Sequence, residues 1–244
     1  MGSEVRNHHT FAGRTIVMLL ALLTGTASLL AGSAGSGSGG TEHAPGIEPI
    51  RFNQDGGNWS GFVTVGRGFR SVSASWREPA VTCTSVNNRF AIWVGIDGYG
   101  SSTVQQTGVA TACSSGAPIR QAWYEMVPDL PVYYANPVHP GDSMTAGVVR
   151  SGRTYTMTIT NNTRKWTRKA TAVADAADAS AEIVVEPAAG SLPRFDVIRF
   201  TDVTVDGQKP GAAAFAIDAT NSRGFETRTS PLSDGRFSVS YLHE

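Results

Sequence analysis

The chain has 244 residues, with 20 basic and 20 acidic side chains and a formal net charge of zero. This balance excludes the basic footprint of a nucleic-acid-binding domain, so we expect no nucleic-acid partner. The length beyond a short leader suits one all-β domain.

Residues 1–34 are typical of an export signal. Arg6 and Arg14 precede an apolar run at residues 15–30, and small residues at 31–34 offer a cleavage site. The run is a little shorter than the ~20 residues that span a bilayer, and a retained N-terminal anchor is the alternative. We therefore expect a secreted protein that is free of the membrane after cleavage. The predicted organisation is a signal peptide at 1–34, a flexible Gly/Ser linker at 35–48 and one domain at 49–244.

From Asn58 onward, short strand-like segments alternate with turn residues. The clearest alternation is at residues 153–160, where every second side chain is a threonine. Residues 89–96 are nearly all apolar, which is typical of a central strand that is buried on both faces. The pattern predicts an all-β fold, a concanavalin-like sandwich of two antiparallel sheets. The other predicted strands are 60–65, 69–76, 103–109, 120–127, 143–149, 195–205, 212–219, 226–229 and 236–242.

Residues 170–181 are the one helix candidate. They are rich in Ala and Asp and are polar all round apart from the alanines. A helical turn and a loop are equally compatible with this composition.

The chain has two cysteines, Cys83 and Cys113. An even count in an exported protein favours one disulfide. Closing a loop of about 30 residues would stabilise the fold by ~3 kcal/mol on the chain-entropy model. The alternative is two buried thiols.

The common hydrolase and metal motifs are absent. His-Glu-x-x-His and Gly-x-Ser-x-Gly do not occur, and we predict no metal site and no cofactor. A Ser-His-Asp triad would need His139 or His243, and His139 lies between prolines in a predicted loop. Hydrolytic chemistry would therefore rest on carboxylates and amides. Two short segments, at 58–60 and 161–163, match the glycosylation acceptor pattern.

The segment at residues 181–187 carries two carboxylates around an Ile-Val-Val run. These β-branched residues favour a strand. On a strand, Glu182, Val184 and Glu186 face one way, and Ile183 and Val185 face the other. Nothing local separates Glu182 from Glu186.

Five segments occur together in an order and spacing that resembles the glutamic peptidases, also called eqolisins, in a secreted, bacterial-type form. They are Asn-Trp-Ser-Gly at 58–61, Trp-Val-Gly-Ile-Asp-Gly at 93–98, Gln-Thr-Gly at 106–108, Trp-Tyr-Glu at 123–125 and Ala-Glu-Ile-Val-Val-Glu at 181–186. The resemblance covers residues 58–241 and implies a two-sheet sandwich that hydrolyses peptide bonds in protein or peptide substrates. A monomer is expected.

The resemblance also implies roles for individual residues. The catalytic pair falls on Gln106 and Glu186, which leaves Glu182 with a strand or surface role. The positions that line or support the substrate cleft fall on Trp59, Trp93, Asp97, Trp123 and Glu125.

These residue types suit peptide hydrolysis by water. A carboxylate can take the proton of the water and return it to the leaving amine, and a primary amide can donate to the oxyanion. An unperturbed Glu has a pKa of roughly 4.3, which predicts activity in acid and loss of activity at neutral pH. Removal of residues 1–34 leaves 18 basic and 19 acidic residues, so charge repulsion in acid predicts a less extreme acid optimum.

The chain departs from the family pattern at a few positions near the expected site. Gln121 stands where an Asp is common, Met126 and Val127 replace an aromatic pair, and Pro187 follows Glu186 in place of an acidic residue. Subsite preference is therefore expected to differ. The alternative function is a non-catalytic carbohydrate- or peptide-binding module that uses exposed tryptophans on the same sandwich.

Overall fold

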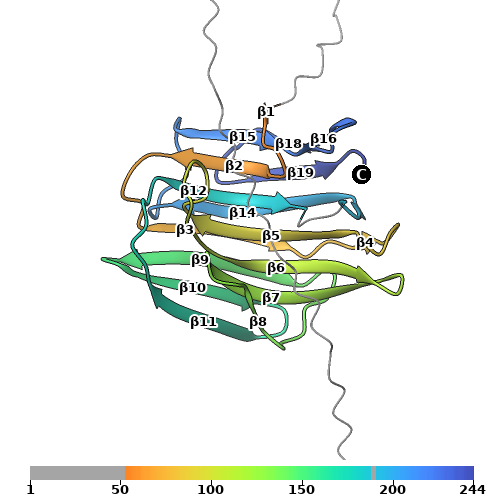
Figure 1. Cartoon of the computed structure of the whole chain (residues 1–244), viewed down its shortest axis with the longest axis horizontal. Helices are drawn as coiled ribbons and strands as arrows, with labels where there is room; N and C mark the ends of the chain where they lie inside the picture. Colours follow the sequence, from red (N-terminus) through yellow and green to blue (C-terminus); the bar gives the residue numbers. More distant parts are fainter. Residues whose placement is uncertain (1–52, 188–190) are drawn as a thin grey trace, which may run out of the picture.

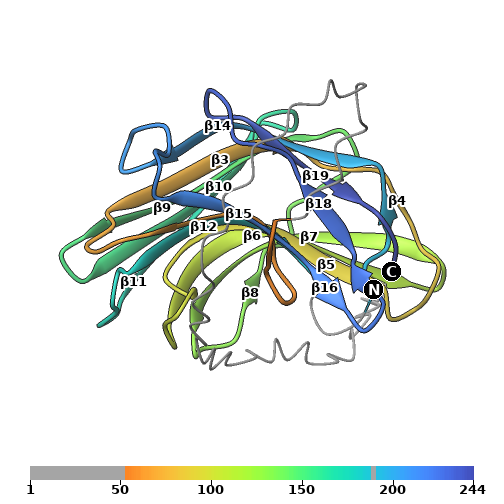
Figure 2. The ribbon, with the colours of Figure 1, turned by 90° about the horizontal axis from the view of Figure 1, so that it is seen from above.

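Two large, mainly antiparallel sheets form most of the described part of the chain, which is residues 53–187 and 191–244 of a computed structural model. Figure 1 shows the strands running side by side, and Figure 2 shows the two sheets as two layers. The signal peptide predicted at 1–34 and the linker predicted at 35–48 lie outside the described residues. Within the described ranges, no helix is long and apolar enough to cross a membrane.

The first sheet contains eight strands. Their order is β1 (Gln54–Asp55), β15 (Ala214–Asp218), β2 (Ser60–Val65), β12 (Ser180–Glu186), β5 (Arg89–Ile96), β6 (Val104–Ser114), β7 (Ala117–Val127) and β8 (Val132–Tyr133). All pairings are antiparallel except the parallel pair of β1 and β15. The four strands β12, β5, β6 and β7 carry most of the residues discussed below.

The second sheet contains seven strands and covers one face of the first (Figure 2). Its order is β11 (Trp166–Val173), β10 (Thr154–Asn161), β9 (Ser143–Ser151), β3 (Ser71–Arg77), β14 (Val197–Val205), β19 (Phe237–Tyr241) and β18 (Thr227–Thr229). Two small pairs complete the described strands: β13 (Arg194–Phe195) with β4 (Val81–Thr82), and β16 (Thr220–Asn221) with β17 (Gly224–Phe225).

The main hydrophobic core fills the space between the sheets. On β10, Tyr155, Met157 and Ile159 are buried in it and the alternating threonines face outward, as the sequence predicts. A second apolar cluster lies on the outer face of the eight-stranded sheet, and it explains why β5 and β12 are buried along almost their whole length. Its buried members are Val63, Ala91, Trp93, Val104, Trp123, Val184 and Ile217.

The predicted sandwich is confirmed, and so is the disulfide: Cys83 and Cys113 are bonded, which excludes two free thiols. The helical turn or loop predicted at residues 170–181 is wrong at both ends. Residues up to Val173 belong to β11, and β12 begins at Ser180.

The sequence analysis missed strand β11. It lies at the edge of its sheet and pairs with β10 along its full length. Most of its residues are exposed or half-buried, and its centre contains Arg168 and Lys169. Such an edge strand lacks the alternation of apolar and polar residues on which the prediction relies.

Candidate active site

The outer face of the eight-stranded sheet carries alternate residues of the sequence motifs on β12, β5, β6 and β7. One row of opposed residues crosses β12, β5, β6 and β7 and consists of Glu182, Gly95, Gln106 and Glu125. Two further rows lie beside it, because every second residue of a strand faces the same way. They consist of Val184, Trp93, Gly108 and Trp123, and of Glu186, Ala91, Ala110 and Gln121.

Gln106 and Glu186 therefore face the same side of the sheet. Only β5 lies between their strands, and their side-chain rows are two rows apart. The neighbouring Gln105 faces the other way, towards the sandwich core, where it is fully buried. The register thus distinguishes two adjacent glutamines that have the same chemistry.

Glu186 is a nearly buried carboxyl with both oxygens hydrogen-bonded. Its exposed fraction is 9%. The Asn58 amide donates to its Oε1 at 2.7 Å, and the Trp93 indole donates to its Oε2 at 3.0 Å. Trp59 packs edge-on against Trp93, with ring centroids 5.1 Å apart. Burial raises the pKa of Glu186 to about 7, and hydrogen bonds from the two indoles and the Asn58 amide oppose that rise.

The Gln106 amide is held by a second buried carboxyl. Its Nε2 donates to Glu125 Oε2 at 2.6 Å, while its Oε1 has no hydrogen-bond partner among the described residues. Burial raises the pKa of Glu125 to about 7, the bond from Gln106 lowers it, and the charge of Glu186 raises it. The two carboxyl groups therefore interact electrostatically across the intervening strands.

Two glycines make this packing feasible and explain the Trp-Val-Gly and Gln-Thr-Gly motifs. A Cβ on Gly108 would lie 2.0 Å from the carbonyl oxygen of Ile92 and 2.7 Å from Cα of Trp93. A Cβ on Gly95 would lie 2.8 Å from the Trp93 ring and 3.2 Å from Cβ of Gln106. The Trp93 side chain thus lies in the space that the missing side chain of Gly95 leaves.

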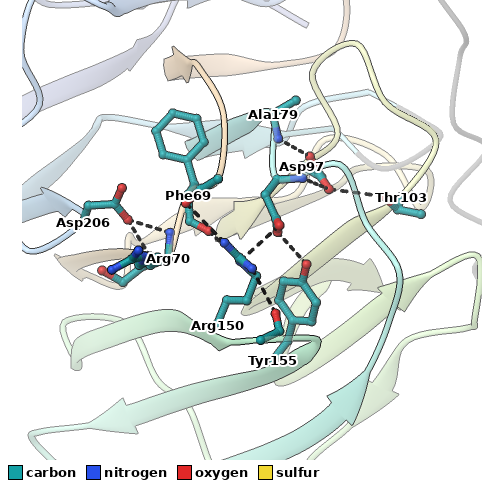
Figure 3. A network of polar contacts seen from close by, with 12 residues as sticks. Phe69, Arg70, Asp97, Thr103, Arg150, Tyr155, Ala179 and Asp206 are labelled. Carbon is teal, nitrogen blue, oxygen red and sulfur yellow. Dashed lines mark hydrogen bonds and ion pairs between the residues drawn. The ribbon is translucent and has the colours of Figure 1, made fainter.

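Asp97 supports the site from the end of β5. It is fully buried, and its carboxylate accepts the backbone N–H groups of Asp178 at 2.9 Å and Ala179 at 2.7 Å (Figure 3). The Asp178 carboxylate in turn accepts the hydroxyl of Tyr155 and contacts Arg150 at 3.1 Å. These contacts tie the start of β12 to the second sheet, so Asp97 fixes the strand that carries Glu186.

The remaining sequence-predicted residues lie as follows. Trp123 is buried in the row next to Gln106, and its Nε1 has no hydrogen-bond partner among the described residues. His139 lies exposed in a loop, as the sequence predicts. Glu182 is fully buried on the outer face, so the surface role considered for it is wrong. Burial raises its pKa well above the usual carboxyl value.

Asn58 is a site residue that sequence reasoning missed. Its segment matches both a glycosylation pattern and the first family segment, but the sequence analysis gave Asn58 itself no role, whereas its side-chain amide donates to the Glu186 carboxylate. The asparagine of the second glycosylation pattern also has a structural role: Asn161 is fully buried, and its amide donates to Asp142 at 2.8 Å. The match of Asn58 to the first family segment was the only signal that could have found it.

The buried carboxyls predict an unusual dependence of stability on pH. Glu125, Glu182, Glu186 and the fully buried Glu78, which contacts Arg120 at 3.5 Å, all have raised pKa values. Between pH 4.5 and about 7 the folded chain therefore binds more protons than the unfolded chain, so stability falls as pH rises through that window.

We expect the free energy of unfolding, measured with urea, to be lower at pH 7.5 than at pH 5 by about 2 kcal/mol or more, the linkage of one such group over that interval. Glu182→Gln removes one titrating group and should flatten the dependence. A stability that is equal or higher at pH 7.5 would contradict the burial of these carboxyls.

Comparisons with known proteins identify the family of the chain. A model of the Peptidase A4 family matches residues 57–241. Aspergillopepsin-2 of Aspergillus niger is 31% identical over 108 residues, which is 36% of this chain and 38% of that protein, so the match spans well under half of that relative. Among solved structures, scytalido-glutamic peptidase with a transition state analog inhibitor has a TM-score of 0.68 at 24% identity, covering 77% of this chain and 99% of its own. Aspergilloglutamic peptidase from Aspergillus niger has a TM-score of 0.57 at 26% identity, covering 64% and 99%. The family model covers most of the chain, which therefore belongs to the peptidase A4 family.

Proposed function

We propose that this protein is an endopeptidase that hydrolyses peptide bonds of protein or peptide substrates with Glu186 and Gln106. The observation that carries the proposal is the register, because it sets Glu186 and Gln106 on one face of the sheet with β5 between them. Family membership supports the reaction class.

In the proposed reaction, the Glu186 carboxylate takes a proton from a water molecule, and the hydroxide formed attacks the carbonyl carbon. The oxyanion accepts a hydrogen bond from the Gln106 amide, which carries no charge and donates at any pH. The C–N bond then breaks as protonated Glu186 gives its proton to the leaving amine.

Glu125 has a positioning role in this proposal. It accepts one N–H of the Gln106 amide, which leaves the second N–H to donate to substrate. When Glu125 is neutral, it adds no negative charge beside the developing oxyanion. The active form therefore combines an ionised Glu186 with a protonated Glu125.

The buried site raises the expected pH range above the acidic one that an ordinary carboxyl predicts. With both pKa values at about 7, Glu186 gains its charge, and Glu125 loses its proton, near neutral pH. The two groups titrate as a coupled pair, so the singly protonated pair is populated only between two apparent pKa values. We expect kcat/KM to rise from pH 4 towards 7 and to decline in alkaline solution.

The experiment is a digest of a denatured protein and a peptide library by the mature chain across pH 2 to 9, with products identified by mass spectrometry. Internal cleavage supports an endopeptidase. A maximum at pH 3 or below would contradict the assignment of the buried Glu186 carboxyl as the group that sets the acid limb. No cleavage at any pH would favour the binding module.

We propose further that residues 1–34 direct export and that the mature protein is secreted. The Cys83–Cys113 disulfide supports this, since disulfides form and persist in oxidising compartments. Mass spectrometry of the protein recovered from culture medium would give its N-terminus. Recovery only from the cell fraction would contradict the proposal.

A further inference from the structure

The exposed residue Asn58 is hydrogen-bonded to the nearly buried carboxyl of Glu186. The residue is exposed and lies between β1 and β2. Its Nδ2 donates to Glu186 Oε1 at 2.7 Å, although the two residues are 128 positions apart. An exposed asparagine side chain is ordinarily mobile, so this bond depends on how the backbone presents it.

The turn that presents this amide is fixed by hydrogen bonds on both sides. Within the turn, the N–H of Trp59 donates to the carbonyl of Gly56 at 3.0 Å, and the N–H of Gly57 donates to Asp55 Oδ1 at 2.8 Å. From outside it, the N–H of Thr220 donates to the carbonyl of Gly57 at 2.7 Å. A Cβ on Gly56 would lie 2.2 Å from the carbonyl oxygen of Trp59, so the turn requires glycine there. The amide is therefore pre-organised.

The bond affects both the direction and the charge of the carboxylate. With the Trp93 indole on Oε2 and the Asn58 amide on Oε1, each oxygen of Glu186 has at least one fixed donor. Hydrogen bonds to a carboxylate favour its ionised form. Among the described residues, Glu125 on β7 is the titratable group that interacts with Glu186: the charge of Glu186 raises the pKa of Glu125. The groups that hydrogen-bond Glu186 are neutral: the Asn58 amide and two indoles.

We propose that Asn58 is a positioning residue that orients the Glu186 carboxylate and favours its ionised form, and so sets the pH range over which Glu186 can act as a base. The inference rests on the proposed function only for its effect on rate. The effect of Asn58 on the ionisation of Glu186 stands on the geometry.

The test is a titration of Glu186 that needs no activity. Glutamate labelled with carbon-13 at Cδ gives one NMR signal per residue, and Glu186→Gln identifies the signal of Glu186 by its loss. We expect Asn58→Ala to raise the pKa of Glu186 by about one unit. Asn58→Ser, which retains a donor, should restore part of the shift. Asn87→Ala, at another exposed asparagine, is the matched control and should leave the titration unchanged.

The same variants are then assayed for peptide hydrolysis. In Asn58→Ala, the acid limb of the pH profile of kcat/KM should shift to higher pH by about the same number of units as the pKa of Glu186. KM and the melting temperature should stay nearly unchanged. Asn58→Asp should place two carboxyls at hydrogen-bond distance, so they share a proton and Glu186 titrates in two steps.

An unchanged titration of Glu186 in Asn58→Ala would overturn the inference, and so would a change confined to KM, which would make Asn58 a substrate contact. An inactive wild type would reject the proposed function, while the titration would still decide the role of Asn58.

Discussion

Glu186→Gln is expected to lower kcat for peptide hydrolysis by about a thousandfold, within the range for loss of a general acid–base group. The substitution preserves the size of the side chain and an oxygen for the Trp93 indole, so the fold should be retained. An amide, however, cannot take a proton from water at any pH used. The measurement is a steady-state assay on one cleaved peptide, with kcat and KM determined separately.

The chain offers a matched control for this variant. Glu182 lies on the same strand and the same face, four residues earlier, and is fully buried. Its raised pKa means that glutamine resembles its protonated form. Glu182→Gln should therefore keep kcat within about twofold of wild type, since this buried structural carboxyl takes no part in the proton transfers of the proposed reaction. Full activity in Glu186→Gln would refute the proposed base.

Gln106→Ala completes the comparison. Removal of one oxyanion donor lowers kcat by about 10²–10³-fold. The same change also leaves the Glu125 carboxyl without its amide partner. The expected result is therefore a lower kcat and a changed alkaline limb in the pH profile of kcat/KM, while KM itself changes little. A rise in KM with unchanged kcat would instead assign Gln106 to substrate binding.

Asp97→Ala is expected to destabilise the fold by about 3–5 kcal/mol, the range for breaking a buried polar network. The change leaves the backbone N–H groups of Asp178 and Ala179 without the carboxylate that they share. It also places alanine at a φ of 67°, where aspartate is tolerated better. Urea unfolding at fixed pH measures the loss.

Asp202→Ala separates these two contributions. Asp202 also has a positive φ, of 53°, but it is exposed, and its carboxylate accepts a hydrogen bond from the adjacent Thr201 hydroxyl. Its replacement should therefore cost about 1 kcal/mol, mostly from backbone conformation. If Asp97→Ala costs no more than Asp202→Ala, the network of Figure 3 does not hold β12 in place.

The fold was predictable where side chains alternate between core and solvent, as they do around Tyr155 and Ile159 on β10. Strand β11 was not, because an exposed edge strand lacks that signal. The distinction between Gln105 and Gln106 depended on family resemblance in the sequence, and the register supplies its physical basis.

The surroundings of the candidate site were harder to predict. The sequence gives no local sign that Glu182 is buried, because its neighbours across the sheet come from distant segments. The bond from Asn58 to Glu186 joins residues 128 positions apart, and no periodicity reports such a contact. Burial also changes the expected pH range, since it moves the Glu186 pKa from its ordinary value to about 7.

The turn beneath Asn58 has a consequence for the order in which the chain folds. Its backbone is fastened to Asp218 and Thr220, which lie more than 150 positions later in the sequence. Contacts of such long range form late, after the segments between them have been made and brought together. The proposed base would thus acquire its full set of hydrogen bonds only when β15 and β16 have docked. A chain that has not yet folded this far would lack the completed centre, so the proposed activity would begin only once folding is nearly finished.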